Sequence, residues 1–110
     1  MRVRERTPLS VEEVRAEAPK PLRFAALRPG AVYRGRVVTY ALGEDGERYA
    51  VLDTGRHWTA VPTERADLAV RSNVVARAQR VEREGERRQL LAWQLDDEER
   101  QRARGHDRER

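Results

Sequence analysis

Between residues 31 and 95, apolar and polar positions alternate in short runs that are rich in Val, Leu and aromatic residues. A period of two residues over such runs is typical of half-buried antiparallel strands. Glycine-containing turns at residues 43–46, 55 and 83–86 divide the runs. The pattern predicts five strands, at about residues 32–42, 47–54, 56–63, 73–82 and 87–95.

The order of these elements predicts the fold class. Three strands in a meander, a short helix over residues 64–70 with Thr63 as its cap, and a final hairpin match an OB-type five-stranded barrel. An SH3-like barrel is the alternative. Closure of either barrel would remove the exposed sheet edges. We therefore expect a mainly β protein with an OB-like barrel domain at residues 31–95.

The segments on both sides of this domain carry helix signals. In residues 1–30, which we expect to form an N-terminal arm, Ser10 and Glu13 form a capping box and Pro19 ends the short helix. We also expect one helical turn at residues 24–27. In residues 96–110, Asp96 and Glu99 form a second capping box, which predicts a charged C-terminal helix and tail.

Composition narrows the class of protein. A length of 110 residues fits one domain, and the lack of cysteine excludes disulfides and thiolate zinc sites. No apolar run approaches the roughly 20 residues that cross a bilayer, so we expect no membrane partner. The basic N-terminus has no apolar segment behind it, and we expect a cytoplasmic protein.

The net charge of +4 is compatible with a nucleic-acid partner but does not by itself indicate one. Arginine supplies all but one of the 23 basic residues, and basic and acidic groups are spread along the whole chain. Arginine-rich composition by itself could produce this basicity. The aromatic residues of the strands give a more specific hypothesis for nucleic-acid binding.

In OB-type binders, aromatic rings stack on unpaired bases while arginines contact the phosphates. We assign Tyr49 and Trp93 to the core, because small barrels need aromatic residues there. Tyr33 and Trp58 have basic neighbours in sequence. The predicted nucleic-acid-binding residues are Tyr33, Arg34, Arg36, Arg48, Arg56, His57 and Trp58. The acidic turn at residues 43–46 opposes this hypothesis, because it would repel phosphate.

Catalytic residues are sparse, since His57 and His106 are the two histidines of the chain. Asp53 and His57 could form an acid–base pair across a tight turn, and hydrolysis is the hypothesis this pair would support. A polar hairpin end is the simpler interpretation. The sequence holds no phosphate loop, nucleophile elbow or His-Glu metal helix, so we expect a non-enzymatic protein without a cofactor or a metal.

Two stretches resemble a known family. Residues 32–38 (VYRGRVV) and 47–56 (ERYAVLDTGR) are similar to the β-rich accessory region that follows the nickase domain in large relaxases of bacterial plasmids. Relaxases nick DNA and pilot it during conjugation, with a tyrosine and a histidine cluster in another domain. The resemblance, which covers residues 31–95, implies an accessory module of a plasmid or mobile element that acts on DNA or on a transfer protein such as a relaxase.

These observations lead to two main hypotheses. The first is an OB-like accessory module that binds single-stranded or nicked DNA through the predicted aromatic and arginine residues. The alternative is an adaptor that docks on another protein through its terminal helices.

Overall fold

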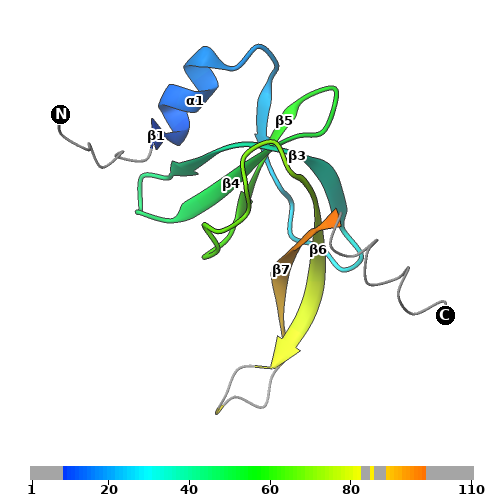
Figure 1. The fold of residues 1–110 in the computed structure, drawn as a ribbon. Helices are drawn as coiled ribbons and strands as arrows, with labels where there is room; N and C mark the ends of the chain where they lie inside the picture. The colour runs from blue at the N-terminus through cyan, green and yellow to red at the C-terminus, as the bar shows by residue number, and fades with distance from the viewer. Residues whose placement is uncertain (1–8, 83–84, 86–88, 99–110) are drawn as a thin grey trace, which may run out of the picture.

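Most of the described chain lies in a single mixed β-sheet (Figure 1). The structure is a computed structural model that describes residues 9–82, 85 and 89–98. Its elements are β1 (Leu9–Ser10), α1 (Val11–Glu17), β2 (Leu22–Phe24), β3 (Val32–Leu42), β4 (Arg48–Asp53), β5 (Trp58–Pro62), β6 (Asn73–Glu82) and β7 (Gln89–Asp97). The prediction of a mainly β protein is confirmed.

The long strand β3 joins the two halves of this sheet. The spatial order is β2-β5-β4-β3-β6-β7, and β1 pairs in parallel with β3. Residues 36–42 of β3 pair with β4, residues 32–36 pair with β6, and the register shifts between Val37 and Thr39. Such a bulge bends a strand, so β3 passes from one half to the other. At Gly35 a Cβ atom would lie 2.5 Å from the Asp53 carbonyl oxygen, so this close approach requires glycine.

Alternation along the strands produces two apolar clusters on opposite sides of the β3–β4–β5 half. The inner cluster lies between the two halves of the sheet and comprises Val37, Ala50, Leu52, Val61, Leu68, Val74, Ala76 and Leu95. The outer cluster comprises Val11, Val14, Leu22, Ala41, Val51 and Ala60. Since half of its members belong to α1 and β2, the N-terminal arm covers the outer face of the sheet.

The predicted N-terminal helix and its capping box are confirmed. The Glu13 amide donates to the Ser10 hydroxyl at 3.1 Å, and the Ser10 amide donates to the Glu13 carboxylate at 3.2 Å. The helical turn expected at residues 24–27 is wrong. Phe24 ends β2, and the next amide, of Ala25, donates to the Ala60 carbonyl at 2.9 Å. The segment is therefore extended because it pairs in parallel with β5.

The closed five-stranded barrel is not confirmed, because the sheet is open. In the part of the chain that the structure describes, no strand pairing joins its two ends, β2 and β7. The edge of β5 that a closing strand would use is occupied by β2. At the open side, Arg65 Nη1 donates to the Leu95 carbonyl at 2.5 Å, so a side chain bridges β7 to the loop after β5.

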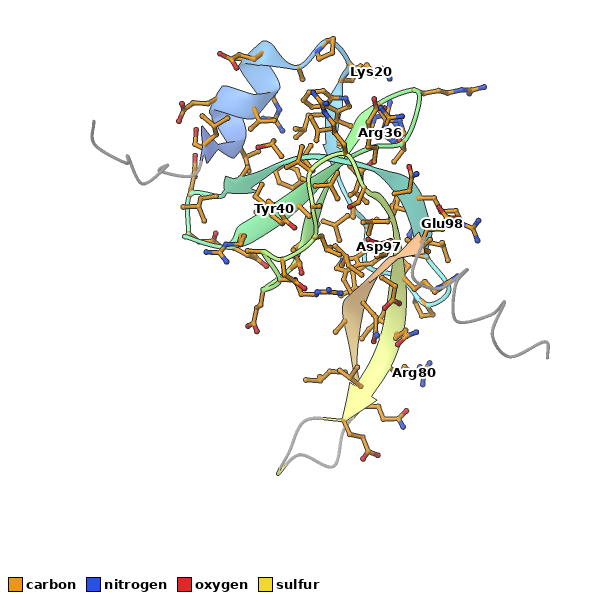
Figure 2. All side chains as sticks on the ribbon, viewed as in Figure 1. Lys20, Arg36, Tyr40, Arg80, Asp97 and Glu98 are labelled. Atoms are coloured by element: carbon orange, nitrogen blue, oxygen red, sulfur yellow. The ribbon has the colours of Figure 1, made fainter. Side chains whose placement is uncertain are left out.

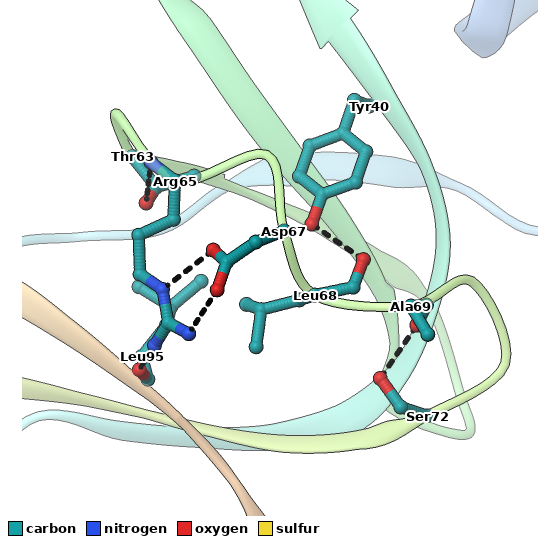
Figure 3. A network of polar contacts seen from close by, with 8 residues as sticks. All are labelled: Tyr40, Thr63, Arg65, Asp67, Leu68, Ala69, Ser72 and Leu95. Atoms are coloured by element: carbon teal, nitrogen blue, oxygen red, sulfur yellow. Dashed lines mark hydrogen bonds and ion pairs between the residues drawn. The ribbon is translucent and has the colours of Figure 1, made fainter.

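The helix predicted at residues 64–70 is also wrong, and a loop takes its place (Figure 3). The Tyr40 hydroxyl donates to the Leu68 carbonyl at 2.7 Å, and the Arg65 guanidinium binds the Asp67 carboxylate at 2.8 Å. In a helix the Leu68 carbonyl would accept from Ser72, but the Ser72 amide donates to Ala69 at 3.0 Å. Tertiary contacts therefore replace the helical hydrogen bonds.

Asp96 and Asp97 are strand where a helix cap was expected, and Glu98, the last described residue, is helical. Asp96 lies opposite Val75 and Asp97 lies opposite Val74, so the capping box at Asp96 is wrong. The rest of the predicted C-terminal helix, at residues 99–110, lies outside the described residues, as does most of the turn at 83–86. In the described ranges, no helix has the length and apolar character needed to span a bilayer.

Candidate nucleic-acid interface

The turn between β4 and β5 holds a carboxylate and an arginine at one end of the sheet. Asp53 ends β4, and its carboxylate accepts a hydrogen bond from the Gly55 amide at 2.9 Å. Gly55 has a φ of 109°, which strongly favours glycine. Thr54 closes the turn, because its amide and hydroxyl both donate to the His57 carbonyl, at 3.1 and 2.8 Å. Arg56 is therefore held at the exposed tip.

The arm contributes a second cation to this turn. Lys20 Nζ lies 2.9 Å from one Asp53 carboxylate oxygen and 3.1 Å from the other. The Lys20 ammonium, followed by the Gly55 amide, lowers the pKa of the Asp53 carboxyl. The carboxylate therefore stays charged at neutral pH and offsets the charge of Lys20.

Two arginines of β3 lie next to this pair. Arg36 is the cross-strand partner of Asp53, and Figure 2 places Arg36 and Lys20 at the same end of the molecule. Arg34 lies two residues earlier on the same face of the strand, and its guanidinium is 3.6 Å from the Glu98 carboxylate. Arg36 is exposed and forms no ion pair with another described residue.

We call Lys20, Arg34, Arg36 and Arg56 the basic surface. Its acidic neighbours are Asp53 and Glu98, which pair with Lys20 and Arg34. Within the described part of the chain, the guanidinium groups of Arg36 and Arg56 have no carboxylate partner. The surface therefore carries about two uncompensated positive charges on groups whose planar donors match the oxygens of a phosphate.

Two of the predicted site residues lie away from the basic surface. Tyr33 points to the inner side, where its ring centroid is 5.5 Å from that of Trp93 and its hydroxyl accepts from the Ala26 amide at 3.2 Å. Arg48 lines a separate groove of about 960 Å³ on the open side of the sheet, which Trp93 and Leu95 also line. Neither residue is therefore part of the surface around Arg36.

Trp58 and His57 border the basic surface without forming its exposed part. Trp58 is the cross-strand partner of Asp53, and its half-buried ring packs against the outer cluster. His57 is half-buried, and its carbonyl accepts the two hydrogen bonds from Thr54. Of the seven predicted residues, Arg34, Arg36 and Arg56 therefore form the accessible cationic group.

Sequence reasoning missed Lys20, and it also missed Arg71, which lies next to the basic surface. Pro19 and Pro21 enclose Lys20 and indicate an extended segment, but nothing local identifies Asp53 as its partner. Arg71 follows the loop and donates its amide to the Val37 carbonyl at 2.7 Å, which brings it beside Arg36 in β3. Both contacts depend on tertiary structure.

In the acid–base hypothesis, the Asp53 carboxylate would act together with His57. In the structure this carboxylate already accepts hydrogen bonds from other groups. Lys20 and the Gly55 amide bind its oxygens, and they favour the charged form. In the described ranges, no cluster of three or more His, Asp or Glu side chains could hold a metal ion.

Comparison of the chain with protein-family models, with curated proteins and with solved structures found no match.

Proposed function

We propose that this chain is a non-enzymatic, partly open OB-type module that binds the phosphate backbone of single-stranded or nicked DNA through its basic surface. The observation that carries the proposal is the pair of exposed arginines, Arg36 and Arg56, whose charges no described carboxylate offsets. Lys20 and Arg34 extend the same surface on either side of Asp53.

The strand order supports the OB-type assignment. Strands β3 to β7, numbered one to five, lie in the spatial order three-two-one-four-five. The first strand is long, bent and shared between a meander and a final hairpin, as in a Greek-key barrel that is open between its third and fifth strands. The loop at residues 63–72 occupies the place between the third and fourth strands.

Phosphate contacts, and not base stacking, are the binding mode we propose. OB-type proteins bind oligonucleotides on the face of their second and third strands. Here the outer face of β4 and β5 is covered by the arm, and Val51 and Ala60 have no exposed surface. Arginine contacts to phosphate are tolerant of sequence and sensitive to salt. The binding we expect is correspondingly weak and unspecific.

The resemblance to the accessory region of relaxases suggests where such binding would be used. A module that holds the backbone of a displaced strand fits a role in plasmid transfer or in the processing of a mobile element. A relaxase or another transfer protein in the cytoplasm is the partner that this proposal implies.

The first test is fluorescence anisotropy with a labelled oligothymidylate at low ionic strength. Because each phosphate contact on a single strand contributes about 0.7 to the slope of log K against log salt, the double variant R36A/R56A should flatten that slope by about 1.4. Its affinity should also fall. The matched control is R28A/R80A, which removes two exposed arginines outside the basic surface.

The control should retain both the affinity and the slope of the unmodified protein. Equal losses in R28A/R80A and R36A/R56A would mean that net charge alone drives binding. Absence of salt-sensitive binding by the unmodified protein would refute the proposal itself.

In the adaptor alternative, the chain would dock on a partner protein through its terminal helices. The apolar side of α1 is not available for such docking. Val11 and Val14 on that side are buried in the outer cluster. Docking through this helix would therefore have to use its exposed charged residues, or else first release the arm from the sheet.

A further inference from the structure

A second surface of the molecule combines an exposed apolar floor with an acidic rim. It is a groove of about 420 Å³ between the start of α1, the end of β2 and the turn that joins β3 to β4. Val11, Phe24, Leu42 and Tyr49 form its floor. We call it the acid-rimmed groove.

The floor leaves part of an aromatic side chain exposed. Phe24 is 49% exposed, although it is one of the large hydrophobic residues of the chain. Its ring packs edge-on against Tyr49 with centroids 5.4 Å apart. The Arg15 guanidinium lies over the Phe24 ring, 5.7 Å from its centroid. Leu9, the residue before Ser10 at the groove, is 40% exposed. Exposed apolar surface inside a polar rim is typical of a binding groove.

The rim is negative. Glu12, Glu44 and Asp45 line the groove, and the described lining residues include no basic side chain. The Asp45 carboxylate is held in place because it accepts from the Glu47 amide at 3.0 Å. The pKa of the Tyr49 hydroxyl is raised, first by burial and then by the charge of Glu47. Arg15 offsets part of the rim, because it pairs with Glu12 at 3.0 Å.

We propose that the acid-rimmed groove binds a basic peptide segment of a partner protein. An apolar side chain of that segment would pack on Phe24 and Tyr49, while flanking Arg or Lys side chains would contact Glu44 and Asp45. The charge complementarity excludes nucleic acid, because carboxylates repel phosphate. This inference does not depend on the proposed DNA binding.

The groove lies at the C-terminal end of β3, and the basic surface lies beside the middle of that strand, around Arg36. Arg36 and Leu42 are six residues apart in that strand, and about 3.3 Å per residue separates them by roughly 20 Å at most. A peptide in the groove and a strand of DNA on the basic surface would therefore not occupy the same site.

The test uses the whole chain and a fluorescein-labelled peptide in which arginine and leucine alternate. Peptides with glutamate in place of arginine, or with serine in place of leucine, serve as comparison probes. Two groove variants are needed: E44Q/D45N removes the charges of the rim and keeps an Asn acceptor for the Glu47 amide, and F24A removes the floor. The matched control is E17Q/E64Q, which removes two exposed carboxylates elsewhere.

We expect saturable binding of the arginine–leucine peptide. Loss of two charge contacts should weaken it about tenfold in E44Q/D45N. A loss of similar size is expected in F24A, and a change of less than about twofold in the control. Both comparison peptides should bind more weakly. Far-UV circular dichroism would establish that F24A is folded, and E44Q/D45N provides the independent test if it is not.

Equal affinity of E44Q/D45N and E17Q/E64Q, or equal binding of the arginine–serine peptide, would overturn the proposal in favour of diffuse attraction between charges. A dimer in sedimentation experiments that F24A abolishes would also overturn it, because the occupant would then be a second copy of this chain.

Discussion

Asp53 organises the basic surface from a position at the end of β4. Its carboxylate binds Lys20, which is 33 residues away in the chain, and the Gly55 amide, which is two residues away. Its main chain pairs with that of Arg36 across the sheet. One residue therefore ties the arm, the turn and β3 together.

The lowered pKa of Asp53 predicts how this contribution depends on pH. The unfolded chain has the ordinary value of about 3.9 and binds the proton more readily than the folded chain. The stability that the Lys20 pair contributes is therefore complete above about pH 5 and is lost as the pH falls through the lowered pKa. Urea unfolding of the unmodified protein and of D53N should differ most at neutral pH and converge at about pH 2.

The exposed residue Glu64 provides the control for this measurement. E64Q should follow the unmodified protein at every pH. A gap between D53N and the unmodified protein that stays constant down to about pH 2 would show that the charge of Asp53 is not the cause.

The residues of the candidate site could be predicted only in part from the sequence. Arg34, Arg36 and Arg56 could be identified because they are close in sequence to Tyr33 or Trp58. Tyr33 is next to Arg34 in sequence but faces the inner cluster, since neighbouring residues of a strand point to opposite sides. Lys20 could not be found, because its partner is supplied by the fold.

At the scale of elements, local patterns predicted the strands well and the connections poorly. The expected strand at residues 32–42 coincides with β3, where alternation is long and Gly43 ends the run. β2 has only three residues, so its sequence is too short to show the alternation that predicts a strand. It is a strand because it pairs with β5. The conformation of the loop at residues 63–72 depends on contacts with distant strands. Tyr40 of β3 donates to the Leu68 carbonyl of the loop, and Arg65 of the loop donates to the Leu95 carbonyl of β7.

The pairing of β2 with β5 makes the arm part of the folded unit. Leu22 is 8% exposed and belongs to the outer cluster. Replacement of a buried leucine by alanine costs about 2–5 kcal/mol, and we expect a value of about 2 kcal/mol for L22A because the site lies near the surface. Urea unfolding should show this loss equally by far-UV circular dichroism and by tryptophan fluorescence.

L27A is the matched control, since Leu27 is 44% exposed and belongs to neither cluster. It should change the free energy of unfolding by less than about 0.5 kcal/mol. If L22A made the arm sensitive to protease but left the circular dichroism transition unchanged, the arm would be a separate unit.

At the scale of the whole molecule, β3 separates two surfaces of opposite charge. The basic surface lies where the middle of β3 passes the β4–β5 turn, and the acid-rimmed groove lies at the C-terminal end of β3. The open side of the sheet, with its groove along Trp93 and Leu95, is a third region with mixed charge. A module of this kind could hold a nucleic acid and a basic partner protein at the same time.

Mapping of amide chemical shifts with an oligothymidylate of about 12 nucleotides tests the central claim most directly. We expect the shifts to concentrate at Lys20, at Arg34 to Val37 and at Thr54 to Trp58, and to fade as salt is added. Residues 43–47 should be unaffected, because the turn there is acidic. Shifts concentrated instead in β7 and along the open side of the sheet, with none at Arg36 or Arg56, would contradict the account.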